Sequence, residues 1–242
     1  MFPYDDPIDV GALLGMGDLF LSPEELLGIL EAHISERRRG RIDEVLVDRT
    51  FTVFPVMDQI HDTGNVAAVL RTSEGLGYGA AWVIESEAQK TSQRVTQGAD
   101  KWVHIERFEK PSDCVHALKD EGIQVVATHL EGAVPLQAVD FTRPTAIVFG
   151  NERDGVCDEV LEASDYRCLI PMHGFVQSFN MSVAAAISLH HILLMRVEHL
   201  GAQGDLTEDQ KRILQAVYYL KAANDPQRLV PRLLRLLGGY DL

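Results

Sequence analysis

Two hydrophobic periodicities alternate along most of this chain, one typical of strands and one of helices. Short apolar or β-branched runs predict five strands, at residues 50–56, 80–84, 123–128, 145–149 and 167–170. Apolar positions at helical spacing predict helices at residues 22–39, 65–76, 112–121, 156–163, 180–200, 207–221 and 226–237, the last one interrupted at Pro231. The pattern predicts the α/β class, a parallel sheet with helices on both faces.

The same pattern divides the chain into a core and two end segments. Residues 50–200 hold the alternating strands and helices, and residues 201–242 add a helical extension. Residues 1–49 form an N-terminal extension that is irregular up to residue 21. A helix then begins at Ser22-Pro23-Glu24-Glu25, where a serine cap, a proline and two carboxylates favour a first turn. We expect one domain with helical extensions at both ends, and the role of residues 1–33 stays open.

Composition excludes several classes of protein. With 242 residues, 46% of them hydrophobic, the chain can bury a core. No apolar run approaches the roughly 20 residues that a membrane span needs, and the N-terminus lacks the features of a signal peptide. The three cysteines are an odd number without CxxC spacing, which argues against disulfides and against a metal site. We therefore expect a cytoplasmic protein with no membrane contact and no metal.

Charge is distributed unevenly along the chain. The net charge of −14 argues against binding nucleic acid through a global positive charge. Residues 36–41 nevertheless place four arginines in six positions, Arg37, Arg38, Arg39 and Arg41, and Arg49 follows. These cations either complement the negative end of a helix dipole or contact phosphate, which suits the planar guanidinium fork.

Three loops after predicted strands hold the candidate chemistry, since ligands of open α/β sheets bind outside the carboxyl ends of the strands. In the first, Asn65 is a candidate helix cap, and Arg71 is either a solvated surface residue or an arginine aimed at a phosphate. In the second, residues 150–155, two glycines let the backbone approach a ligand beside Glu152. The third, residues 171–180, brings Ser178 and Asn180, which also suit a plain helix cap.

No motif for a Rossmann dinucleotide site, a P-loop or a serine-hydrolase elbow occurs in the sequence. Taken in order, however, the three loops resemble the SpoU/TrmH family of RNA ribose 2′-O-methyltransferases, within the SPOUT superfamily. The matching segments are Asn65-x5-Arg71-Thr72, Phe149 through Gly155, and Ile170-Pro171-Met172 with Gln177 through Ala184. The resemblance covers roughly residues 35–200 and is nearest to the TrmH branch, which methylates a guanosine in the tRNA D-loop. Phe179 and Met181 depart from the family, where Leu and Val are commoner.

The resemblance implies a fold, a cofactor and an assembly that the pattern does not show. The fold would end in a deep trefoil knot, an exception to unknotted topology. The cofactor would be S-adenosylmethionine, and the protein would be a homodimer with its site near the subunit interface. Carried over by position, the cofactor cradle comprises Thr128, His129, Leu130, Phe149, Gly150, Ile170, Met172 and Phe179.

The resemblance also assigns the chemistry. Arg71 would activate the ribose hydroxyl, and because a guanidinium stays protonated it would act by charge stabilisation and phosphate positioning. Asn65, Glu152, Ser178 and Asn180 would orient the reacting groups. The RNA, most readily tRNA, would contact Arg37, Arg38, Arg41 and Arg49, with Arg232 and Arg235 as weaker candidates. An rRNA substrate and a non-catalytic, knotted RNA-binding protein are the alternatives.

Overall fold

The computed structural model describes residues 1–85 and 101–237, and the chain forms two compact units. The first, here called the sheet unit, consists of Met1 and Arg49–Asp205, and the second, the end unit, consists of Phe2–Asp48 and Leu206–Leu242. The two end segments, which the sequence divides at residues 49 and 201, are therefore parts of one unit.

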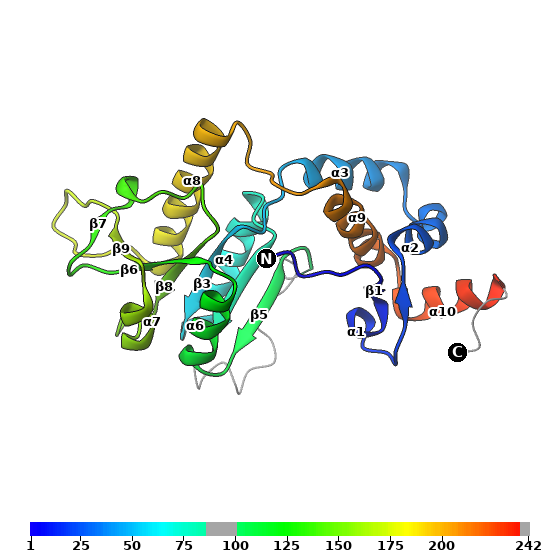
Figure 1. Ribbon diagram of the computed structural model, residues 1–242, viewed down its shortest axis with the longest axis horizontal. Coiled ribbons are helices and arrows are strands. Elements are labelled where there is room, and N and C mark those ends of the chain that lie inside the picture. The colour runs from blue at the N-terminus through cyan, green and yellow to red at the C-terminus, as the bar shows by residue number, and fades with distance from the viewer. Residues whose placement is uncertain (86–100, 238–242) are drawn as a thin grey trace. The chain divides into compact units, whose positions relative to one another are not determined.

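The sheet unit is built on seven parallel strands in the order β5-β4-β3-β8-β6-β9-β7 (Figure 1). The strands are β3 (Val53–Asp58), β4 (Ala80–Ile84), β5 (His104–Phe108), β6 (Gln124–Thr128), β7 (Val134–Pro135), β8 (Thr145–Gly150) and β9 (Tyr166–Leu169). The chain runs outward from β3 through β4 to β5 and then crosses to the other side of β3, so a topological switch point lies between β3 and β8. Ligands bind at such points.

The sequence pattern identifies the central strands and misses the edge strands. β3, β4 and β8 are buried almost throughout, which explains their continuous apolar runs. β5 pairs only with β4 at one edge and carries His104, Glu106 and Arg107, half-buried or exposed, so it lacks the apolar signal. β7 has only two residues.

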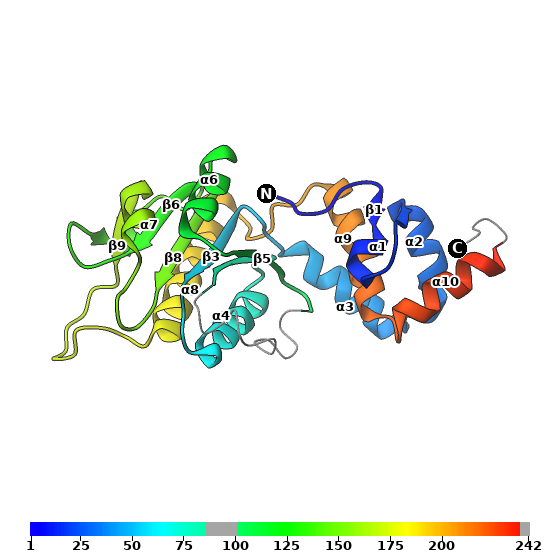
Figure 2. The same cartoon turned by 90° about the horizontal axis from the view of Figure 1, so that it is seen from below.

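Helices cover both faces of the sheet (Figures 1 and 2). α4 (Thr63–Gly75) and α8 (Met181–Leu200) pack together on one face, and α6 (Pro111–Asp120) and α7 (Asp158–Ala163) pack together on the other. Between β7 and β8 the chain makes one short 3-10 turn, η2 (Leu136–Ala138). The mixed α/β class and the parallel sheet predicted from the sequence are confirmed.

By length and hydropathy alone, α8 is apolar enough to cross a membrane, and it is the only such helix among the described residues. This departs from the expectation that no segment comes near that requirement. Ala185, Leu189 and Ile192 of α8 are fully buried in the core against the sheet, and Arg196 in its last turns is buried too. One face of α8 thus belongs to the core of the sheet unit.

Both ends of the sheet unit meet in one hydrogen-bonded cluster. The Asp205 carboxylate accepts hydrogen bonds from Thr50 Oγ1 (2.6 Å), from Thr52 Oγ1 and from the buried Arg196 guanidinium (2.9 Å). The backbone N–H of Asp205 donates to the carbonyl of Arg49 at 3.3 Å. The first and last residues of the unit's main segment are therefore tied to each other.

The end unit brings together helices from both ends of the chain. It contains α1 (Val10–Leu14), α2 (Pro23–Leu30), η1 (Glu31–His33), α3 (Glu36–Val47), α9 (Glu208–Ala222), α10 (Pro226–Leu236) and a two-stranded sheet of β1 (Ile8–Asp9) and β2 (Phe20–Leu21). α9 packs on α2 and α3, and α10 packs on α2. α10 continues through Pro231, where the sequence predicts an interruption, because Val230, Pro231 and Leu234 are buried together and packing offsets the lost backbone hydrogen bond.

The arginine-rich segment begins a helix instead of ending one. The expected helix over residues 22–39 is broken, because Ile34 is extended and Ser35 caps a new helix by accepting the N–H of Arg38. Arg37 and Arg38 therefore lie in the first turn of α3, where the helix dipole disfavours cations. The interpretation of these arginines as partners of a helix C-terminus is wrong.

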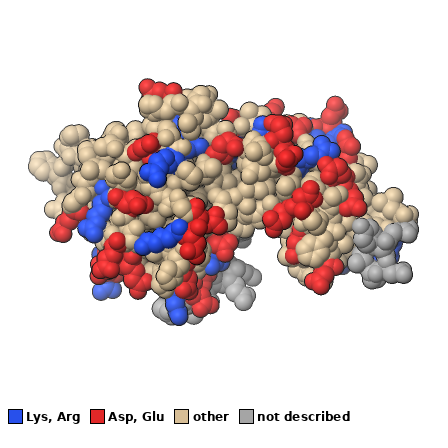
Figure 3. All heavy atoms as spheres, in the orientation of Figure 1, with Lys and Arg blue, Asp and Glu red and all other residues tan. Residues whose placement is uncertain are grey.

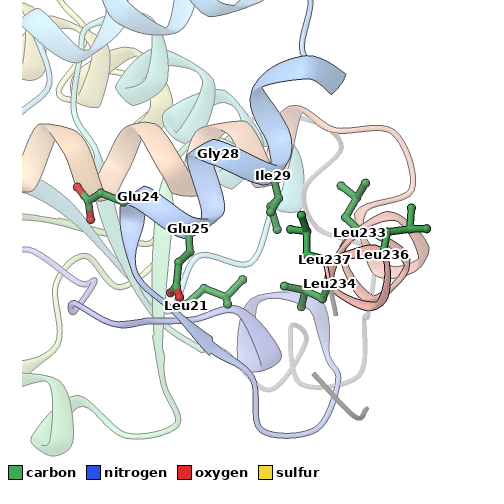
Figure 4. A pocket seen from close by; sticks show the side chains of 9 residues that line it. All are labelled: Leu21, Glu24, Glu25, Gly28, Ile29, Leu233, Leu234, Leu236 and Leu237. Carbon is green, nitrogen blue, oxygen red and sulfur yellow. The ribbon is translucent and has the colours of Figure 1, made fainter. Parts of the chain in front are cut away.

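An apolar groove of about 580 Å³ lies between α2 and α10 within the end unit (Figure 4). Its walls come from the β2–α2 segment on one side and from the last turns of α10 on the other. The lining residues are Leu21, Glu24, Glu25, Gly28, Ile29, Leu233, Leu234, Leu236 and Leu237.

Candidate functional site

A second hollow of about 580 Å³ lies in the sheet unit, at the carboxyl ends of β6, β8 and β9. All eight residues predicted for the cofactor cradle line it: Thr128, His129, Leu130, Phe149, Gly150, Ile170, Met172 and Phe179. They meet because the carboxyl ends of neighbouring parallel strands lie at one edge of the sheet. Glu152 and Ser178 of the predicted catalytic set line the same cavity.

The loop after β8 folds tightly on itself at this edge. A Cβ on Gly150 would lie 2.0 Å from the backbone carbon of Gly155 and 2.1 Å from the nitrogen of Val156, so only glycine fits there. Gly155 has a φ of 76°, in the region that glycine adopts readily. Asn151 Oδ1 accepts the N–H groups of Arg153 (3.0 Å) and Asp154 (2.8 Å) and fixes the turn between them.

Three of the predicted catalytic residues form one hydrogen-bonded chain. Asn65 Nδ2 donates to Glu152 Oε1, and Asn180 Nδ2 donates to Asn65 Oδ1 at 3.3 Å. Asn180 Oδ1 also caps α8 by accepting the N–H of Ser182 at 2.9 Å. These hydrogen bonds join the starts of α4 and α8 to the loop after β8. One set of three side chains therefore fixes three loops.

Asn65 is not the cap of its helix. Asp62 caps α4 by accepting the N–H of Gly64 at 2.8 Å, and Asn65 lies inside the first turn, where its side chain is almost fully buried. This earlier start frees the Asn65 amide to bind Glu152 and Asn180.

Arg71 lies apart from this chain. It is exposed on α4 and makes no hydrogen bond or ion pair with the residues that the structure describes. Six residues separate it from Asn65, which corresponds to about 240° around a helix. Ser178 is likewise exposed, in the segment between β9 and α8, and it lines the cavity.

The prediction that Arg49 contacts RNA does not agree with the position of its side chain. Its side chain is 1% exposed, and its guanidinium donates to the carbonyl of Tyr78 (3.3 Å) and pairs with the Glu74 carboxylate (3.0 Å). A buried guanidinium with these acceptors has a structural role. Arg37, Arg38 and Arg41 are exposed on α3.

The thiols of the sheet unit are suited to packing. Burial raises the pKa of Cys168, which lines the cavity, to about 12, so the thiol stays protonated near neutral pH. Burial likewise raises the pKa values of Cys114 and Cys157 to about 12. In the described part of the chain, no three His, Cys, Asp or Glu side chains come together as a metal site would require.

On the inner wall of the cavity, sequence reasoning found Met181 and Ala184 only as parts of a matching segment and missed Ser188. Met181, Ala184 and Ser188 recur at positions i, i+3 and i+7 of α8, so one stripe of this helix lines the hollow. Small residues two turns into a long helix give no chemical signal in a sequence. The stripe emerges only when α8 is packed beside β8.

Comparison with known proteins agrees with this geometry. A model of the SpoU rRNA Methylase family matches residues 52–190. The tRNA (guanosine(18)-2′-O)-methyltransferase of Aquifex aeolicus is 33% identical over 205 residues, which cover 83% of this chain and 97% of that protein. The enzyme of the same name from Escherichia coli K12 is 37% identical over 155 residues, which cover 63% of this chain and 68% of the relative.

Solved structures give the same picture. The crystal structure of the A. aeolicus TrmH/SpoU tRNA modifying enzyme matches with a TM-score of 0.69 at 33% identity and covers 78% of this chain and 98% of its own. The SpoU methyltransferase AviRb from Streptomyces viridochromogenes, in complex with the cofactor AdoMet, matches with a TM-score of 0.52 at 25% identity, covering 64% of this chain and 61% of its own.

Proposed function

Because this chain belongs to the SpoU methylase family, we propose that it transfers a methyl group from S-adenosylmethionine to the 2′-hydroxyl of a guanosine ribose in the D-loop of tRNA. The observation that carries this proposal is that every residue expected to cradle the cofactor lines one cavity, beside the Glu152–Asn65–Asn180 chain. The tRNA relatives named above are 33% and 37% identical to this chain, which favours tRNA over rRNA.

The cavity suits the cofactor in chemistry. Its wall combines apolar side chains with the backbone of Gly155, where a Cβ would meet nothing within 4 Å and a ligand can therefore approach main-chain groups closely. Phe149, Ile170 and Met172 would hold the flat nucleoside, and the backbone of the segments after β6 and β9 would supply hydrogen bonds. When bound, S-adenosylmethionine supplies a methyl group activated by a sulfonium.

The residues around the cavity would orient the ribose hydroxyl and position the group that accepts its proton. We assign to Arg71 the binding of an RNA phosphate, because its guanidinium is exposed and stays protonated. The held phosphate would accept the hydroxyl proton as the oxygen attacks the methyl carbon and the carbon–sulfur bond breaks. Asn65, Glu152 and Asn180 would keep the loops in the geometry for this in-line attack.

The segment between β9 and α8, at the left of Figure 1, would form the trefoil knot of the SPOUT superfamily by passing through the loop that precedes it. Its residues from Ile170 to Phe179 are half-buried or exposed, and several line the cavity. Threading through the preceding loop, together with contacts to the bound cofactor, would hold this uncharged and loosely packed segment in one place.

We propose a homodimer that forms on the exposed face of α8. Val183, Ile187, Leu194 and Val197 recur at helical spacing and are between 38% and 53% exposed. An apolar stripe on a helix that already packs on the sheet indicates a protein partner. Since α4 lies beside α8, a second copy there would come close to the helix that carries Arg71. Sedimentation of the I187E variant tests this, with a monomer as the expected result.

The RNA would lie against the exposed arginines of the end unit. Arg37, Arg38 and Arg41 project from α3, and α10 adds Arg232 and Arg235, all exposed. Figure 3 shows acidic and basic side chains mixed over the face in view, so a local patch has to supply the attraction that the net charge of −14 does not.

Methylation of a defined transcript tests the proposed function. The purified protein, S-adenosylmethionine and an unmodified tRNA should yield one 2′-O-methylguanosine, which mass spectrometry of nuclease fragments assigns to the D-loop. A transcript with 2′-deoxyguanosine at that position is the control and should stay unmethylated. Methylation of rRNA fragments alone would support the rRNA alternative, and no methylation of any RNA would favour a non-catalytic binding protein.

A further inference from the structure

Ser188 is a buried serine whose hydroxyl has no hydrogen-bond partner among the described residues. Its side chain is 0% exposed, and it lines the cavity of the sheet unit. A helical serine commonly donates to the carbonyl four residues earlier, as Ser73 does to Val69 at 2.8 Å in α4. A buried hydroxyl without a partner is unfavourable, so this one is left with a hydrogen bond to offer to a molecule in the cavity.

The position of Ser188 indicates which part of a ligand it meets. It lies seven residues after Met181 on the lining stripe, about 10 Å farther along α8. Phe149 and Cys168, which also line the cavity, are buried, and burial keeps the Cys168 thiol neutral. The charged side chains that line the cavity, Glu131, Glu152, Arg153 and Asp154, are all exposed.

The other hydroxyl on this wall is already engaged. Thr128 Oγ1 donates to the carbonyl of Val148 at 2.9 Å and is spent on holding β6 to β8. Ser188 is thus the buried side-chain hydroxyl of the cavity that keeps its donor, among the residues described. A charged carboxylate or ammonium next to it would lose its water without gaining an ionic partner, whereas a neutral nucleoside would not.

We propose that the Ser188 hydroxyl hydrogen bonds to the nucleoside end of S-adenosylmethionine, and that the amino-acid end lies toward the exposed charged residues. This assignment rests on the cofactor proposed for the cavity, and it concerns binding of the cofactor and not the methyl transfer itself. Ser188 is therefore a residue for cofactor recognition.

Calorimetry with two ligands tests the assignment on the full-length protein without RNA. The S188A variant should bind S-adenosylhomocysteine about five- to tenfold more weakly than the wild type, the usual effect of one lost hydrogen bond. Adenosine alone should weaken by the same factor, since the homocysteine part does not meet Ser188. S188C, which keeps the shape but donates weakly, should have affinities between those of the wild type and of S188A.

S73A is the matched control, because Ser73 is also a buried helical serine but its hydroxyl is satisfied away from the cavity. S73A should lower the melting temperature and leave both affinities unchanged, whereas S188A should leave the melting temperature of the free protein unchanged or raise it. A lower melting temperature in S188A would assign the hydroxyl to the fold and overturn the proposal.

Other outcomes separate this proposal from the proposed function. Equal affinities of wild type and S188A for S-adenosylhomocysteine would overturn the role of Ser188 while leaving methyl transfer untouched. Weakened S-adenosylhomocysteine binding with unchanged adenosine binding would move the contact to the amino-acid end and overturn the nucleoside assignment. Failure of the wild type to bind either ligand would remove the cofactor site, and both proposals with it.

Discussion

The two hollows of this protein have the same volume and opposite chemistry. The groove between α2 and α10 in the end unit is lined by leucines, an isoleucine and a glycine with two glutamates (Figure 4). The cavity of the sheet unit combines apolar side chains with strand ends, the carboxylate of Glu152 and an unpartnered hydroxyl. Volume therefore does not identify a ligand site, and polar groups that converge on an apolar wall do.

The difference arises from how each hollow is made. Parallel strands that end at one edge deliver loops from distant parts of the sequence to one place, and loops carry backbone donors and acceptors. The groove of the end unit lies between two amphipathic helices whose backbone groups are satisfied internally. Its two glutamates are engaged by Ser22 and Arg212, so the groove offers mainly aliphatic contact.

Loss of the Arg71 side chain should have the largest effect. The R71A variant should lose about 10²- to 10³-fold in the rate of methyl transfer, because a charge-stabilising donor is removed, and should keep its affinity for S-adenosylhomocysteine within a few-fold. Single-turnover kinetics with tRNA and calorimetry measure the two effects. R143A is the control, because Arg143 is exposed and lies just before β8, at the amino ends of the strands and away from the cavity. Full activity in R71A would remove Arg71 from the mechanism.

Hydrogen exchange should separate the two hollows directly. At 100 times its Kd, S-adenosylhomocysteine stabilises the state that it binds by about 2.7 kcal/mol, so amides between Ile170 and Phe179 should exchange more slowly. The amides of Pro226–Leu237 beside the other groove should not respond. Protection of both segments, or of neither, would contradict the division between a ligand site and a packing groove.

A glycine in each hollow provides a matched pair of substitutions. G150A should cost about 1–3 kcal/mol of unfolding free energy and weaken S-adenosylhomocysteine binding, because the new Cβ would overlap Gly155. G28A should instead stabilise the protein by up to about 1 kcal/mol, since Gly28 lies within α2 and its Cβ would meet nothing within 4 Å. Chemical denaturation and calorimetry on both variants check the contrast, and weaker ligand binding in G28A would link the groove to the cofactor site.

Reversing charge on α3 should produce the smallest effect and leave both hollows intact. The double variant R38E/R41E should bind tRNA more weakly, with a salt dependence flattened by a slope of about 0.7–0.9 for each lost phosphate contact. Titrations of labelled tRNA at several salt concentrations give the slope. E44K, a charge change on the same helix that removes the partner of Arg41, should strengthen binding. An unchanged slope in R38E/R41E would mean that α3 does not contact RNA.

The sheet could be predicted because its information is local. The apolar runs of β3 and β8 indicate buried strands, and because ligands bind at the carboxyl ends of such strands, the sequence alone places residues 149–155 at the site. The same reasoning fails where the partner is distant. Arg49 becomes a buried residue through Glu74 and Tyr78, 25 and 29 residues away, and its own neighbourhood in the sequence gives no sign of this.

The end unit was beyond local reasoning for the same reason. The apolar face of α2 continues through Ile34 in the sequence, so the break at Ser35 is hidden by a periodicity that does not stop there. Nothing in residues 1–48 indicates that they pack on residues after 206. Ser188 could not be predicted because a serine inside a helix has no signature in the sequence, and only the structure shows that its hydroxyl lacks a hydrogen-bond partner.

The Asp205 cluster makes the sheet unit an insert within the end unit. The chain enters at Arg49 and leaves at Asp205, two residues whose backbones are hydrogen bonded to each other, so the unit has adjacent ends like a domain placed into a loop of a host. Apart from the peptide link after Met1, its connection to the end unit is a pair of neighbouring chain segments. We therefore expect that residues 49–205 can be permuted without cutting the sheet, and that the end unit with its exposed arginines can change in sequence independently of the cofactor cavity.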